Sequence, residues 1–487
     1  MDSRPTDPTF DMDPEELRRH AHTVADWIAD FVGGIEDRPV LPKIRPGEVS
    51  AQLPAAAPDE GEAMDAILRD FDRLIVPATT QWNHPGFHAY FANTASGPGI
   101  LAEALIAAVN DNAMLWRTGP AATELEIRTC DWVRDLVGLP AGFEGHIEDT
   151  ASTSTLIALA AARHRATDGE VRTKGLAGRA PLRVYCSEEA HSSVERACIV
   201  LGLGTEGCRR VATDDEFRLR PDALRAAIDE DLRDGVRPMA VVATTGTTST
   251  TSVDPVPEIA AICAEQSLWL HVDAAYGGAM GASERFRWVL EGVDRADSVV
   301  INPHKWLFVP MDCSVLLYRD PEALRAAFSL VPPYLMTPED AVARNLMDYG
   351  VALGRRFRSL KLWFVLRWFG RRGIASLIEH HVDLAADFAR WIDGADDWER
   401  LAPAPMSTVL FRHVPSRLRG DEDGLRAHNE AIMHRVNDEG GSFVSHTVVR
   451  GRFALRAAVG NARTRGEHMA RLRERLRRAA GEVTPAA

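Results

Sequence analysis

The stretch "SVVINPHKWLF", residues 298–308, decides how the rest of the chain is interpreted. Its apolar beginning, Ser298 to Ile301, predicts a short buried strand. A lysine, Lys305, follows that strand between a histidine and a tryptophan. In α/β folds with parallel sheets, ligands bind beyond the carboxyl ends of the strands. The stretch therefore predicts an α/β fold in which the Lys305 amine has a chemical function.

Similar strand-like runs lie on both sides of this stretch, and helical stretches separate them between residues 100 and 331. The runs are "LRVYC" (182–186), "MAVVAT" (239–244), "LWLHVDA" (268–274), "SVVIN" (298–302) and "SVLLY" (314–318). Alternation of helices with β-branched strands is typical of a mainly parallel sheet covered on both faces. We expect the polar residues that follow these strands to gather at one edge of the sheet.

The amino-terminal region differs from this central pattern. Residues 13–35 and 63–75 have helical spacing, and Leu17, Val24, Trp27, Ile28 and Phe31 fall on one face of the first helix. A proline-rich connector joins the two helices. Such helices predict an arm that docks on a second subunit, and a cap on the same chain is the alternative.

The carboxyl-terminal region predicts a small α+β domain. "STVLFRH" (407–413) and "GRFALRAAV" (451–459) have the composition of strands, and "GEHMARLRERLRRAA" (466–480) that of a closing helix. The expected organisation is an amino-terminal helical arm that serves dimerisation (1–90), a large domain (91–380) and a small carboxyl-terminal domain (381–487).

Composition narrows the class of protein. The 487 residues carry a formal net charge of -14, which argues against a nucleic-acid surface. No apolar run is long enough to cross a bilayer, the acidic start lacks a signal core, and the six cysteines form no C-x-x-C pair. We therefore expect a cytoplasmic protein without membrane or nucleic-acid partners. His84 and His88 are separated by proline and glycine, so no zinc site is predicted.

The polar residues beyond the strands form a set that fits one ligand. Asp273 and Lys305 alone would more often form a buried ion pair, and a single histidine such as His191 is usually structural. However, five hydroxyl residues lie between Thr150 and Thr155 at the start of an alanine-rich helix, and an ordinary N-cap needs only one. Pyridoxal 5'-phosphate (PLP) needs an amine for its aldehyde, a carboxylate for its ring nitrogen and a helix terminus for its phosphate. His191 and Ala275 would cover the two faces of its ring.

Several stretches together carry a specific resemblance. They are "WNHPGFHAYF", "PAATELE", "AHSSVERA", "HVDAAYGG", "ADSVVINPHKWL", "DCSVLLY" and "LGRRFRSLKLWF". In these the chain resembles the PLP-dependent aromatic-L-amino-acid decarboxylases of the group II decarboxylase family, from about residue 15 to near its end. The resemblance implies a fold-type I homodimer with a helical arm, a large cofactor domain and a small α+β domain. It also implies decarboxylation of an aromatic L-amino acid, of the tyrosine, tryptophan, phenylalanine or dihydroxyphenylalanine class, to the amine and CO2.

The resemblance also assigns roles to individual positions. Lys305 matches the Schiff-base lysine, Asp273 the partner of the ring nitrogen, and His191 the stacking histidine that helps to orient the substrate. Tyr334 matches the proton donor, carried on a loop that closes over the neighbouring subunit's site. The other implied cofactor contacts are Ala151, Ser152, Thr248, Ala275, Asn302 and His304. The implied aromatic wall of the substrate pocket consists of Trp82, Tyr90 and Phe91, for which core packing is the alternative.

The chain departs from the family pattern at two positions. Asp149 stands where animal relatives usually have glycine at the phosphate turn, and Asn93 stands where they have threonine. An acid beside a phosphate is unexpected, so we expect Asp149 to point away from the turn or to meet an arginine.

Other functions are less consistent with these residues. Glutamate decarboxylases usually have serine in place of the tyrosine of "DAAYGG", and animal histidine decarboxylases have serine in place of His304. A non-enzymatic relative would not need Lys305, Asp273, His191 and Tyr334 together. Aldehyde-forming relatives replace the tyrosine at 334 or the stacking histidine, so an amine product is predicted. The preferred aromatic amino acid stays open.

Overall fold

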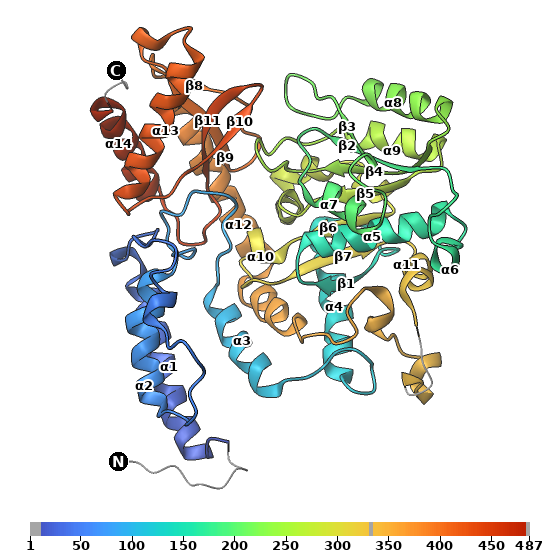
Figure 1. The fold of residues 1–487 in the computed structure, drawn as a ribbon, viewed down its shortest axis with the longest axis horizontal. Coiled ribbons are helices and arrows are strands. Elements are labelled where there is room, and N and C mark those ends of the chain that lie inside the picture. Colours follow the sequence, from blue (N-terminus) through green and yellow to red (C-terminus); the bar gives the residue numbers. More distant parts are fainter. Residues whose placement is uncertain (1–10, 331–334, 484–487) are drawn as a thin grey trace.

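A computed structural model describes residues 11–330 and 335–483 of the chain. Within them, a large sheet of seven strands has the order β1-β7-β6-β5-β4-β2-β3 (Figure 1). The strands are β1 (Glu144–Glu148), β2 (Leu182–Ser187), β3 (Cys208–Val211), β4 (Arg237–Thr244), β5 (Trp269–Asp273), β6 (Ser298–Ile301) and β7 (Ser314–Tyr318). Only β7 runs against its neighbours β1 and β6, while β2 to β6 pair in parallel. The predicted mainly parallel α/β sheet is confirmed.

Helices cover both faces of this sheet, and the central strands β4, β5 and β6 are accordingly buried on both sides along most of their length. One face packs against α4 (Pro120–Val137), α8 (Pro221–Arg233) and α9 (Val256–Glu265). The other packs against α5 (Ala151–Ala166), α7 (Ser193–Val200) and α11 (Pro321–Phe328). Two short helices, α6 (Val171–Lys174) and α10 (Pro303–Trp306), complete this part of the chain.

A second, antiparallel sheet has the order β10-β11-β9-β8. Its strands are β8 (Trp398–Arg400), β9 (Thr408–His413), β10 (Ser445–Val449) and β11 (Arg452–Ala458), and it packs against α13 (Glu422–Asp438) and α14 (Gly466–Glu482). The predicted strands β9 and β11 and the closing helix are confirmed. The helix α12 (Ser359–Asp393) runs from one sheet to the other and is interrupted at Gly370, whose φ is +62°. The division of the chain at residue 380, inside α12, stays a prediction.

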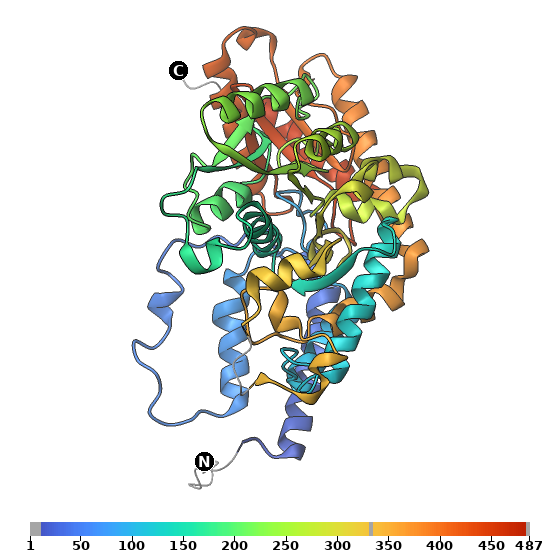
Figure 2. The same ribbon diagram turned by 90° about the vertical axis from the view of Figure 1, so that its right-hand side faces the viewer.

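The amino-terminal helices α1 (Pro14–Gly33) and α2 (Met64–Asp70) project from the body at the end where the chain begins (Figures 1 and 2). The α2 helix continues as a π-helical turn, Phe71–Ile75, and the helix α3 (Gly97–Val109) follows. The predicted apolar face of α1 is covered only in part within the chain, because Trp27 packs against Phe71 whereas Leu17 is 57% and Val24 is 38% exposed. In the described ranges, we find no helix with the length and apolar character that a membrane span needs.

Candidate active site

A cavity lies where β4, β5 and β6 end and α5 begins, at the edge of the sheet that the sequence predicts. It is lined by Phe91, Thr150, Ala151, Ser152, His191, Thr244, Gly246, Thr248, Asp273, Ala275, Tyr276, Asn302, His304 and Lys305. Every residue expected to contact the cofactor is therefore in one cavity, although residues as far apart as 151 and 305 contribute to it.

Lys305 and Asp273 face the cavity from neighbouring strand ends. Asp273 is the last residue of β5 and is 6% exposed, and its Oδ1 accepts a hydrogen bond from the Ala275 N–H at 3.1 Å. Lys305 lies in the short helix α10 that follows β6. Burial lowers the pKa of Lys305, an effect that the charge of Asp273 opposes. The lowered pKa increases the fraction of neutral amine, which is the nucleophilic form.

Two histidines in the cavity have defined tautomers. The Nδ1 atom of His191 accepts a hydrogen bond from the Ser193 N–H at 3.1 Å, and the Nδ1 atom of His304 accepts one from the Cys313 N–H at 3.1 Å. Burial lowers the pKa of His191 and lowers that of His304 to about 3. Both rings are therefore neutral near pH 7 and carry their proton on Nε2.

The amino terminus of α5 forms the turn where a phosphate would bind. Thr150 is the extended residue before the helix, and the first-turn amides of Ala151 and Ser152 have no acceptor within the helix itself. Not all five hydroxyls serve this turn. Ser154 contacts Ser314 at 2.9 Å and Thr155 contacts His271 at 3.4 Å, both in the protein core. The sequence pattern therefore predicts more hydroxyl groups at the phosphate turn than the structure places there.

Two buried polar atoms of the cavity lack a partner. The Asn302 Oδ1 and Thr244 Oγ1 atoms accept and donate no hydrogen bond among the described residues. Buried polar atoms are nearly always paired, so these atoms indicate that a polar ligand completes the site. Together with the Lys305 amine, the Asp273 carboxylate and the α5 terminus, they fit PLP.

Of the three residues predicted to form an aromatic wall, Phe91 lines the cavity. Its ring stacks on Tyr276 with 3.8 Å between centroids, and the Lys305 Nζ lies 5.2 Å from the ring. Trp82 and Tyr90 instead form a neighbouring cluster with Phe87 and Phe443 outside the lining of the cavity. Their contact with substrate stays a prediction.

Sequence reasoning missed Arg456, which comes from β11 of the small domain. Its guanidinium lies 4.7 Å from the Phe91 ring centroid and donates to the Tyr90 carbonyl at 2.5 Å. The side chain is buried, burial lowers its pKa to about 10, and its Nη2 has no acceptor among the described residues. No spacing signal connects residue 456 with residue 91, so only the fold reveals the contact.

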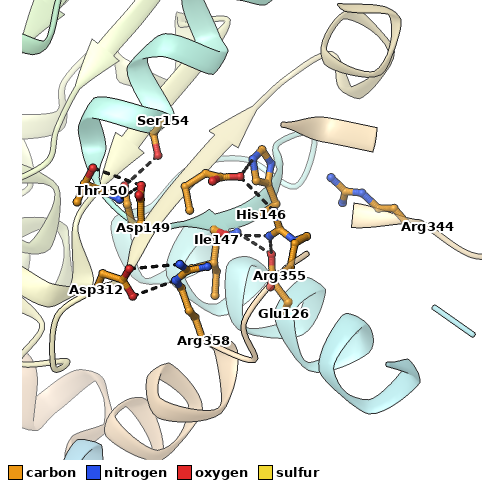
Figure 3. A network of polar contacts seen from close by, with 12 residues as sticks. Glu126, His146, Ile147, Asp149, Thr150, Ser154, Asp312, Arg344, Arg355 and Arg358 are labelled. Carbon is orange, nitrogen blue, oxygen red and sulfur yellow. Dashed lines mark hydrogen bonds and ion pairs between the residues drawn. The ribbon is translucent and has the colours of Figure 1, made fainter. Parts of the chain in front are cut away.

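Behind the phosphate turn lies a network of ion pairs (Figure 3). Arg355 contacts Glu126 at 2.5 Å and Glu148 at 3.1 Å, and Arg358 contacts Asp312 at 3.0 Å. Asp149 belongs to none of these three pairs, and its carboxylate accepts hydrogen bonds from the Thr150 N–H and hydroxyl. The expected contact of Asp149 with an arginine is not found among the described residues, and Asp149 is not one of the residues that line the cavity. Tyr334 lies outside the described residues.

Comparison with known proteins assigns this geometry to a family. Residues 46–414 match the pyridoxal-dependent decarboxylase conserved domain. The chain is 38% identical to a phenylacetaldehyde synthase of Arabidopsis thaliana, with 94% of each chain covered, and 37% identical to an aromatic-L-amino-acid decarboxylase of Sus scrofa, with 98% of each covered. The crystal structure of Oryza sativa TDC with PLP and tryptamine superimposes with a TM-score of 0.94 at 33% identity, covering 97% of this chain and 99% of that one. The chain therefore belongs to the PLP-dependent group II decarboxylases.

Proposed function

We propose that the protein converts an aromatic L-amino acid to the corresponding amine and CO2. The observation that carries this proposal is the Phe91 ring, which forms an apolar wall beside the Lys305 amine. A substrate held near that amine meets an aromatic surface, on which a second ring can pack. The relatives named as aromatic-L-amino-acid, tyrosine and tryptophan decarboxylases support the same substrate class.

Residues of the cavity would hold the cofactor in a fixed orientation. Lys305 would bind its aldehyde, the α5 terminus with Ala151 and Ser152 its phosphate, and Asp273 its ring nitrogen. Thr248, Ala275, Asn302 and His304 would complete the contacts. When bound, PLP supplies an electron-withdrawing ring that accepts the electron pair left on the α-carbon as CO2 departs. The Asp273 carboxylate keeps a proton on the ring nitrogen, because an adjacent negative charge raises the pKa of that nitrogen.

The remaining roles concern the substrate and its protons. His191 would cover one face of the ring and present its Nε2–H toward the substrate, since Ser193 occupies Nδ1. Arg456, whose Nη2 has no acceptor in the described part of the chain, would attract the substrate carboxylate from the side of Phe91. Tyr334 would deliver a proton from its hydroxyl to the α-carbon after CO2 has left.

Formation of an aldehyde is the second candidate activity, because a phenylacetaldehyde synthase is among the similar relatives. The two activities differ in what reaches the α-carbon, a proton or dioxygen. The sequence keeps both Tyr334 and His191, which aldehyde-forming relatives alter, and this favours the amine.

The proposed enzyme acts as a homodimer in the cytoplasm. Large apolar residues of α1, α2 and α3 are exposed in the single chain, among them Leu17 (57%), Ile67 (46%) and Leu101 (66%). Exposed apolar patches of this kind are typical of subunit interfaces. All six cysteines are buried free thiols, which supports a reducing compartment.

A substrate panel tests the proposed function. CO2 release by the PLP-loaded enzyme would be measured with tyrosine, tryptophan, phenylalanine and dihydroxyphenylalanine, and in parallel with glutamate, cysteine sulfinate and histidine. We expect at least one aromatic substrate to exceed every other amino acid in kcat/KM by about 100-fold, a difference of about 2.7 kcal/mol in transition-state binding. A higher kcat/KM for glutamate, cysteine sulfinate or histidine would contradict the proposal.

A further inference from the structure

Asp149 places a negative charge at the turn that would hold the cofactor phosphate. Its Oδ1 accepts a hydrogen bond from the Thr150 N–H at 2.5 Å and one from the Thr150 hydroxyl at 3.3 Å (Figure 3). Thr150 lines the cavity directly before Ala151 and Ser152. One amide and one hydroxyl at the start of α5 are thus already bonded to a carboxylate of the same chain.

The other carboxylates near this turn have arginine partners. Arg355 pairs with Glu126 and Glu148, and Arg358 pairs with Asp312. None of the basic residues in the described part of the chain forms an ion pair with Asp149. Among the described residues, Asp149 therefore lacks the arginine partner that Glu126, Glu148 and Asp312 have.

The cavity itself supplies little positive charge to offset Asp149. Among the described residues that line it, Lys305 is a basic side chain whose pKa is lowered by burial, an effect that the charge of Asp273 opposes. Burial lowers the pKa of both His191 and His304, so their rings are neutral. A phosphate dianion at this turn depends on amide and hydroxyl donors, and a neighbouring carboxylate raises its energy by charge repulsion.

We propose that Asp149 weakens cofactor binding and makes the cofactor readily exchangeable. Without PLP, the carboxylate satisfies the Thr150 donors and stabilises the empty turn at the positive end of α5. When PLP binds, its phosphate must compete for these donors and lie close to the carboxylate. The inference rests on the cofactor, which the family establishes, and not on the identity of the substrate.

Titration of the cofactor-free protein with PLP tests this inference. Asp149→Asn removes the charge but keeps an oxygen that can accept from Thr150, and Asp229→Asn removes an exposed charge on α8 as the matched control. The dissociation constant would be measured from the quenching of tryptophan fluorescence, to which Trp306 beside Lys305 contributes. We expect Asp149→Asn to bind PLP about tenfold more tightly than the wild type, equivalent to about 1.4 kcal/mol. The Asp229→Asn control should match the wild type.

A parallel titration with pyridoxal, which lacks the phosphate, distinguishes charge repulsion from a general change of the site. Asp149→Asn should leave the dissociation constant of pyridoxal unchanged. Unchanged or weaker PLP binding by the variant, or equal tightening of PLP and pyridoxal, would overturn the inference. Asp149→Ser is the second variant, and melting curves of the cofactor-free proteins identify any that fail to fold. Because no substrate is present, failure here is distinct from failure to decarboxylate an aromatic amino acid.

Discussion

At the scale of single residues, Asp273 is expected to govern the chemical step. Asp273→Asn keeps the shape of the side chain and removes the charge that holds a proton on the cofactor nitrogen. The electron pair on the α-carbon is then less stabilised in the transition state, so kcat should fall by about 100-fold or more while KM changes little. Steady-state kinetics on the best aromatic substrate measures both constants. A large rise in KM with unchanged kcat would contradict the assigned role.

Tyr334 is expected to decide the product. Tyr334→Phe removes only the hydroxyl, so the pocket is kept while the α-carbon goes without its proton and reacts with dioxygen. The variant should consume oxygen and release aldehyde, ammonia and hydrogen peroxide in near-equal amounts. Assays of amine, aldehyde and oxygen uptake in wild type and variant compare the two routes. Amine as the sole product at the wild-type rate would mean that another group donates the proton.

Several residues of the site could be predicted because they follow apolar strands. Asp273 and Lys305 come at or just after runs that predict buried strands, and His191 follows "LRVYC" in the same way. Arg456 and Thr244 could not be assigned to the site from the sequence. Arg456 reaches the Phe91 ring from the other sheet, and the importance of Thr244 appears only from its hydroxyl, which has no partner among the described residues. The sequence shows that Asp149 departs from the family pattern, but the bond of its carboxylate to Thr150 depends on local backbone geometry.

At the scale of elements, Arg355 joins β1 and α4 to the segment before α12. It is 5% exposed and its two partners, Glu126 and Glu148, are buried with it. Arg355→Gln would leave two carboxylates buried without a counterion, which costs about 3–5 kcal/mol of unfolding free energy. The neighbouring Arg356→Gln is the matched control, because its pair with Glu103 is partly exposed and should contribute less than about 1 kcal/mol. Urea unfolding of the two variants measures the difference, and equal stability would contradict a structural role for Arg355.

The ion pair between Arg355 and Glu148 predicts that the stability of the fold depends on pH. Burial tends to raise the pKa of Glu148, but its bond to His146 and the charge of Arg355 outweigh burial and lower the pKa to about 2. A carboxyl with a lowered pKa stabilises the fold above its unfolded pKa of about 4.3, and this contribution is lost as pH falls toward the folded pKa. The stability difference between wild type and Arg355→Gln should therefore be largest near neutral pH and shrink as the pH falls toward about 2. A difference that grows on acidification would contradict this.

Elements differ in how well the sequence predicts them. The five predicted strands of the large sheet form because their β-branched residues are buried on both faces. The strands β1 and β3 were not predicted, since "EGHIE" and "CRRV" are short and charged. The buried carboxylate of Glu148 in β1 is paired with Arg355, more than 200 residues later, and no local sequence pattern carries that information.

At the scale of the whole molecule, the exposed apolar faces of α1, α2 and α3 predict a dimer whose subunits share active sites. If Tyr334 serves the neighbouring site, a mixture of Lys305→Ala and Tyr334→Phe chains should form heterodimers in which one site has both residues intact. Amine formation should then appear, although neither variant alone produces the amine at the wild-type rate. Subunit exchange must be verified by mixing chains with different tags. Verified exchange without recovery of amine would contradict a shared site.

The stoichiometry of the wild-type reaction tests the central claim most directly. The PLP-loaded enzyme would be given its best aromatic L-amino acid, and CO2, amine, aldehyde and oxygen uptake would be measured in one reaction, with Lys305→Ala as the control. We predict one amine for each CO2, no oxygen uptake above background, and no amine from Lys305→Ala. Aldehyde with matching oxygen uptake from the wild type, or amine formation by Lys305→Ala at the wild-type rate, would contradict the account.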